Sequence, residues 1–116
     1  MLSRIYTAHY RYNGPDRVNI TVKGKDPLWS AFAPSWDMVM GIKNGTMSEA
    51  EYIRRYDIIL SKVPVVVWKA LLEMDEATFV CFCNEDWFCH RNMLVNYIVN
   101  SLGGAPGRVT YGGWRV

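Results

Sequence analysis

The stretch from Ala77 to Cys83 constrains the fold more than any other part of the chain, because nearly every residue in it favours a β-strand. Surface strands usually alternate between apolar and polar residues, whereas this run reads Ala-Thr-Phe-Val-Cys-Phe-Cys and carries no charge. Such a run is typical of a strand that is covered on both faces, as the inner strands of parallel sheets are. We therefore expect 77–83 to be a central strand.

The rest of the chain alternates between strand and helix patterns. Further strands are predicted at 4–12, 17–23 and 108–111, and helices at 35–42, 48–61, 64–74 and 89–102. Ser35 and Ser48 are the predicted N-caps of the first two helices, and Gly45 should end the first. Strands that alternate with helices predict an α/β fold, a Rossmann-like sandwich in which a mostly parallel sheet is flanked by helices. We expect a single small domain over residues 1–116.

Composition excludes some classes of protein. The chain has 116 residues, half of them hydrophobic, with a formal charge of +2, so charge does not indicate a nucleic-acid partner. The longest apolar run is too short to span a bilayer, and the N-terminus lacks a secretory signal, which together favour a cytoplasmic protein without membrane contact. The three cysteines lie within nine residues, and this odd, clustered set suits a site better than a disulfide framework.

The candidate site lies where the predicted central strand runs into the last helix. Ligands bind at this edge of open α/β sheets, and a helix N-terminus attracts anions. Arg91 could grip a phosphate or carboxylate, and the helix field should lower the pKa of Cys89 and favour its nucleophilic thiolate. His90, Glu85 and Cys83 are the other candidate catalytic residues, Glu85 as an acid, a base or an orienting group.

Two other interpretations of these residues remain open. Cys81, Cys83, Cys89 and His90 are four potential zinc ligands, but their spacing is not the usual pair of Cys-x2-Cys knuckles. Alternatively, the cysteines are apolar filler and Arg91 pairs with a neighbouring carboxylate. We expect no cofactor.

Residues outside this segment could also reach a ligand. If the first strand pairs in parallel with the central strand, Thr7 or Tyr10 could reach a ligand bound at the site. Lys43, beside the Asn44–Gly45 turn, is either a further ligand contact or a solvated side chain.

Most of the chain resembles the bacterial, archaeal and phage proteins grouped as domain of unknown function 488 (DUF488). The resemblance rests on several segments, namely Ile5-Tyr6-Thr7, Ala33-Pro34-Ser35-Trp36, Lys43, the Tyr52 to Tyr56 helix, Cys81-Phe82-Cys83 and Phe88-Cys89-His90-Arg91. It implies a small α/β domain with the Cys-His-Arg element beside a sheet edge. It is also compatible with a phage or bacterial source, and a phage protein would be expected in the host cytoplasm. Glu85 stands where many longer members keep a glutamate.

Three functions follow as hypotheses. The first is an enzyme, or a degenerate one, that binds a small anionic ligand bearing a phosphate, such as a nucleotide. The second is a module that binds nucleic acid or protein through its aromatic side chains, among them Trp29, Trp36, Trp87 and Trp114. The third is a structural zinc or redox-thiol protein. The sequence does not indicate an oligomeric state.

Overall fold

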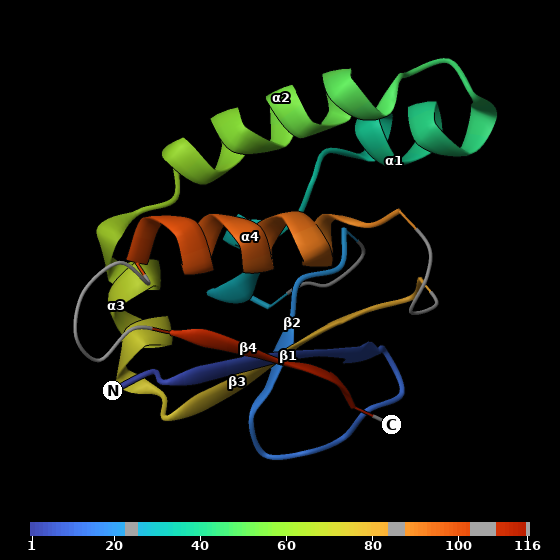
Figure 1. The fold of residues 1–116 in the computed structure, drawn as a ribbon. Helices are drawn as coiled ribbons and strands as arrows, with labels where there is room; N and C mark the ends of the chain where they lie inside the picture. The colour runs from blue at the N-terminus through green and yellow to red at the C-terminus, as the bar shows by residue number, and fades with distance from the viewer. Residues whose placement is uncertain (23–25, 84–87, 103–108, 116) are drawn as a thin grey trace.

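The computed structural model describes residues 1–22, 26–83, 88–102 and 109–115 of the chain (Figure 1). Four strands, four α-helices and one 3-10 helix lie within these residues. In chain order they are β1 (Arg4–His9), β2 (Arg17–Asn19), the 3-10 helix η1 (Trp29–Phe32), α1 (Trp36–Asn44), α2 (Glu49–Ser61), α3 (Val65–Glu73), β3 (Glu76–Cys81), α4 (His90–Leu102) and β4 (Thr110–Arg115).

The strands form one sheet in the order β2-β3-β1-β4, and every pairing is parallel. The predicted α/β fold with a parallel sheet is therefore confirmed. The strand predicted to be central, β3, pairs with β2 on one side and β1 on the other. Because all strands run the same way, their carboxyl ends share one edge, where His9 of β1 stands opposite Cys81 of β3.

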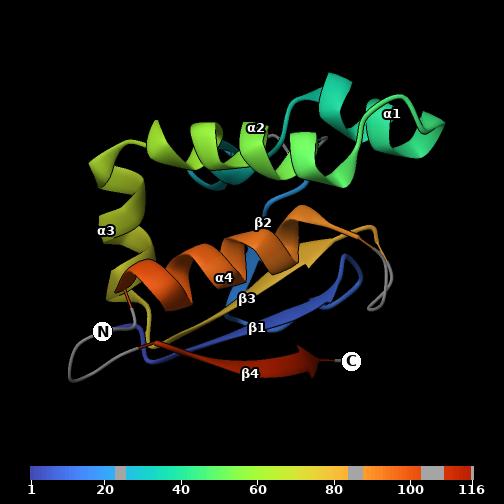
Figure 2. The same cartoon turned by 45° about the horizontal axis from the view of Figure 1, so that its top comes forward.

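The four α-helices lie on one side of the sheet, and the connection from β1 to β2 crosses the other side (Figures 1 and 2). This connection passes β3, where the amide of Thr78 donates to the carbonyl oxygen of Asp16 at 2.8 Å. The side chain of Thr78 also donates to the Asp16 carboxylate at 2.6 Å. A short loop thus makes the first crossover, and the helical side alone carries the hydrophobic core.

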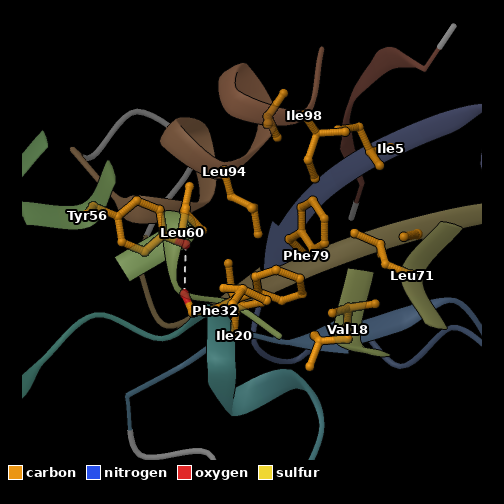
Figure 3. Close-up of a cluster of buried hydrophobic side chains, with 14 of the residues drawn as sticks. Ile5, Val18, Ile20, Phe32, Tyr56, Leu60, Leu71, Phe79, Leu94 and Ile98 are labelled. Carbon is orange, nitrogen blue, oxygen red and sulfur yellow. Dashed lines mark hydrogen bonds between the residues drawn. The ribbon is translucent and has the colours of Figure 1, made fainter. Parts of the chain in front are cut away.

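The core fills the space between the sheet and the helices (Figure 3). Ile5 of β1 and Phe79 of β3 meet Leu94 and Ile98 of α4, and all four side chains are fully buried. At the far side of the core the buried hydroxyl of Tyr56 donates to the carbonyl oxygen of Phe32 at 2.7 Å, as the dashed line in Figure 3 marks. This bond lets a polar side chain lie in an apolar interior.

The helix boundaries follow local capping chemistry. The hydroxyl oxygen of Ser35 accepts from the amide of Met38, and that of Ser48 accepts from the amide of Glu51, so both predicted N-caps are confirmed. Gly45 follows α1 in the left-handed conformation with φ of 72°, as predicted for its end. Among the described residues, no helix combines the length and the apolar character that crossing a membrane would require.

The strand boundaries differ from the predicted ones. β1 stops at His9 rather than residue 12, because the chain turns there and the amide of Tyr12 donates back to the carbonyl oxygen of His9. β2 covers only Arg17–Asn19, and β3 ends at Cys81, so Cys83 lies beyond the strand.

The last strand is also displaced from its predicted position. β4 begins at Thr110 and runs to Arg115, through Gly112 and Gly113 beyond the predicted end of the strand at residue 111. Its register against β1 shifts between Ile5 and Tyr6, and such a bulge lets Gly112 and Gly113 take part in the strand.

Candidate functional site

Three thiols converge where β3 ends and α4 begins, two segments that meet at the same edge of the sheet (Figure 1). Cys81 is the last residue of β3, Cys83 follows two residues later, and Cys89 directly precedes α4. Their sulfur atoms all lie within 4.8 Å of one another, and those of Cys81 and Cys83 are 4.0 Å apart. All three are free thiols, Cys81 and Cys89 buried and Cys83 partly exposed. We call this group the thiol cluster.

The cluster ionises most easily at Cys81. The pKa of this thiol is held well below its ordinary value, because the S–H groups of Cys83 and Cys89 donate to the sulfur once it is ionised. The same bonds raise the pKa of Cys89, and burial raises it further. The pKa of Cys89 thus shifts in the opposite direction to the one predicted from the helix field, and its role as a nucleophile stays a prediction.

His90 is held in one orientation by a backbone carbonyl. Its Nε2 atom lies 2.7 Å from the carbonyl oxygen of Ile20, and because that oxygen can only accept, Nε2 carries the hydrogen. Burial lowers the pKa of His90, which favours the neutral ring. The other ring nitrogen, Nδ1, then has a lone pair and lies 3.7 Å from the sulfur of Cys89. His90 therefore joins the cluster through Cys89.

Arg91 is fully buried in the first turn of α4. Its Nη1 atom donates to the carbonyl oxygens of Ala8 at 2.7 Å and of Cys81 at 3.4 Å, which joins the carboxyl ends of β1 and β3. Its guanidinium also lies 4.8 Å from the ring centre of Trp114 in β4. The pKa of Cys83 is raised chiefly by its S–H bond to Cys81, and the charge of Arg91 opposes that rise. Direct contact between Arg91 and an anion remains a prediction.

The other predicted ligand residues lie in different surroundings. Thr7 is buried in β1, with its hydroxyl 2.6 Å from that of Tyr111. The amide of Tyr10 donates to the carbonyl oxygen of Cys81 at 2.7 Å, but its ring stacks on Phe82. Lys43 is exposed in the last turn of α1. Glu85, predicted as a catalytic residue, lies outside the described residues. The structure thus brings Cys83, Cys89, His90 and Arg91 together.

The tryptophans considered for a binding surface do not share one environment. Trp29 stacks near Phe32 beside the core, Trp114 lies against Arg91, and Trp36 is about half exposed at the start of α1. Trp87 lies outside the described residues. A binding surface built from these side chains stays a prediction.

Sequence reasoning missed three residues that shape this site. The carbonyl of Ile20 orients His90, and Trp114 of β4, predicted only as an aromatic of a binding surface, lies against Arg91. Tyr52 of α2 is the third, since its ring packs edge-on against Phe88, next to Cys89, and burial raises its pKa. No local signal in the sequence could show that Tyr52 lies beside this site.

Comparison with known proteins agrees with the motif at this site. A family profile described as the active DUF488-N3 subclade matches residues 2–102, which include the thiol cluster, His90 and Arg91. No curated protein and no solved structure was found to match the chain. Because the profile covers most of the chain, the protein belongs to the DUF488 family.

Proposed function

We propose that this protein is a thiol-dependent enzyme that acts on a small anionic ligand, phosphate-bearing or nucleotide-like, at the carboxyl edge of its sheet. The observation that carries the proposal is the convergence of three free thiols within 4.8 Å beside the first turn of α4. Ligands of open α/β sheets bind at this edge, and unpaired N–H groups of a helix start attract anions. The description of the matching subclade as active also supports an enzyme.

Cys83 is the group that meets the ligand in this proposal. It is partly exposed, whereas Cys81 and Cys89 are buried, and its sulfur lies 4.0 Å from that of Cys81, the neighbour that takes its proton in this proposal. The Cys83 sulfur gives an electron pair to an electrophilic carbon or phosphorus atom of the ligand, and the bond from that atom to its leaving group breaks. The proton first carried by Cys83 passes through the neighbouring sulfur to the leaving group, so atoms and charges balance. Buried Arg91 favours the anionic sulfur through its positive charge.

Protection of Cys83 from alkylation tests this proposal. The reduced protein, kept metal-free with a chelator, is incubated with iodoacetamide and with inorganic phosphate, nucleotides or phosphorylated sugars. Modification at Cys83 is then followed by mass spectrometry. We expect a phosphate-bearing compound, present at ten times its dissociation constant, to slow alkylation about tenfold.

Uncharged nucleosides are the matched control ligands, because they keep the base and sugar but lack the phosphate. They should leave the rate of alkylation unchanged. The proposal fails if no phosphate-bearing compound slows the reaction, or if nucleosides slow it equally.

A further inference from the structure

We infer that the thiol cluster and His90 also form a binding site for a thiophilic divalent metal ion, Zn²⁺, with four ligands from the chain. The ligand atoms are the sulfurs of Cys81, Cys83 and Cys89 and the Nδ1 nitrogen of His90. This inference goes beyond the proposed function, since metal binding needs no ligand and no turnover.

The distances between the donor atoms fit tetrahedral zinc. Zinc–sulfur bonds of about 2.3 Å in a tetrahedron place two sulfurs about 3.8 Å apart. The sulfurs of Cys81 and Cys83 are 4.0 Å apart, and all three sulfurs lie within 4.8 Å of one another. A zinc–nitrogen bond places nitrogen and sulfur about 3.6 Å apart, close to the 3.7 Å between Nδ1 of His90 and the sulfur of Cys89. The three sulfurs are therefore close enough to share one ion, and Nδ1 of His90, beside the sulfur of Cys89, supplies the fourth donor.

The surroundings of His90 match those of a metal ligand. Histidines that bind zinc usually donate the N–H of their other ring nitrogen to a carbonyl or carboxylate, which fixes the ring and its tautomer. Nε2 of His90 donates to the carbonyl oxygen of Ile20 at 2.7 Å, so Nδ1 presents its lone pair toward Cys89. His90 is 3% exposed, so the ring is held by its surroundings before a metal arrives. The hydrogen bond that usually orients a zinc-bound histidine is therefore already present.

The donor set selects the metal. Three thiolates and one imidazole are soft or borderline ligands, which favour Zn²⁺ over Mg²⁺ or Ca²⁺, ions that prefer oxygen ligands. The spacing Cys81, Cys83, Cys89, His90 looked unlike a zinc motif because it lacks two Cys-x2-Cys knuckles. The ligands nevertheless converge, because Cys83 lies just past the end of β3 and Cys89 directly precedes α4 at the same edge of the sheet. A zinc ion bound there would also withhold Cys83 from the proposed thiol chemistry.

Cobalt substitution of the full chain tests this site. Co²⁺ is added to reduced, metal-free protein without any phosphate, and thiolate charge-transfer and tetrahedral d–d absorption bands are recorded. We expect both bands to saturate at one ion per chain and to vanish when Zn²⁺ displaces Co²⁺. Absence of these bands, or saturation only far above one ion per chain, would overturn the inference.

Single substitutions identify the ligands. C81S, C83S and C89S should each weaken Zn²⁺ binding by more than about tenfold, measured by competition with a chromophoric chelator. H90Q keeps an N–H group able to reach the carbonyl of Ile20 but removes the Nδ1 ligand, and it should weaken binding about tenfold or more.

H9Q is the matched control, since His9 accepts from the amide of Arg11 and lies outside the cluster. The four-ligand site would be contradicted if H9Q and H90Q lost equal affinity for Zn²⁺, or if H90Q kept the affinity of the unaltered chain. Circular dichroism of each variant shows whether it is folded. If a variant unfolds, the cobalt spectrum of the unaltered chain still tests the metal site. The zinc titration lacks phosphate and the alkylation assay contains a chelator, so either idea can fail alone.

Discussion

Asp16 anchors the loop that connects β1 to β2 across the side of the sheet opposite the α-helices. Its carboxylate accepts hydrogen bonds from the hydroxyls of Tyr12 and Thr78, each at 2.6 Å, and lies 3.6 Å from the guanidinium of Arg115. Partial burial alone would raise the pKa of Asp16, but the two hydroxyl bonds outweigh burial and lower it. The ionised carboxylate therefore stabilises the folded chain.

Acid should weaken the fold partly through Asp16. Because its folded pKa is below the unfolded value of about 4, its contribution is present above that pH and is lost as pH falls through the folded pKa. We expect D16N to lower the free energy of unfolding by about 1–2 kcal/mol at pH 7, and the difference from wild type to shrink below about pH 4. Urea unfolding across a pH series measures this.

The exposed Asp57 of α2 offers a control, and D57N should stay within about 0.5 kcal/mol of wild type. A D16N deficit that persists unchanged at pH 2 would show that lost packing, rather than lost charge, is responsible.

At the scale of elements, β4 depends on two glycines. Gly113 has φ of 106°, a conformation that side chains rarely adopt, and it lies just after the register shift against β1. A Cβ atom on Gly112 would overlap the ring of Tyr6, on which the guanidinium of Arg115 rests at 3.6 Å. These glycines therefore allow β4 to lie close to β1, and β4 in turn brings Trp114 to Arg91.

A methyl group at position 113 should loosen this edge of the sheet. We expect G113A to cost about 1–2 kcal/mol of unfolding free energy, because alanine is strained at positive φ. It should also change the near-ultraviolet circular dichroism of the aromatic contacts. T110A, an exposed position in the same strand, is the control and should change both measurements little. Equal effects in the two variants would refute the backbone explanation.

At the scale of the whole molecule, stability should concentrate in the middle of the sheet. β1 and β3 are hydrogen-bonded on both sides, and their inward side chains lie in the hydrophobic core. By contrast β2 spans only Arg17–Asn19, and α1 has mostly exposed or half-buried side chains. Opening the inner strands requires loss of the core, whereas α1 can open locally.

Native-state hydrogen exchange should follow this division. Amides of β1 and β3 should exchange slowest, at rates that track global unfolding in denaturant, and amides of α1 should exchange much faster and independently of it. Exchange monitored by mass spectrometry or NMR measures the order. Inner-strand amides that exchange as fast as those of α1 would mean that the sheet is not the stable unit.

The site could be predicted in part. Adjacent Cys89, His90 and Arg91 at a helix start marked the right region, and the continuous apolar run placed Cys81 on an inner strand. The ionisation state of the cluster could not be predicted, because it depends on which sulfurs share protons across the space between β3 and α4. Nor could the partners of Arg91 be read from the chain, since Ala8 lies 83 residues away.

The sequence itself determined the capped helix ends, the parallel character of the sheet and the covered central strand. Caps, turns and periodicity act over a few neighbouring residues, so each leaves a local pattern. Ser35, Ser48 and Gly45 show this, since their own side chains or backbone end the helices. Tertiary structure alone decided that β4 contains its glycines and that Cys83 lies past its strand. It also decided that three thiols meet beside His90. Those outcomes depend on contacts between segments far apart in the chain, and such contacts produce no recognisable pattern in neighbouring residues.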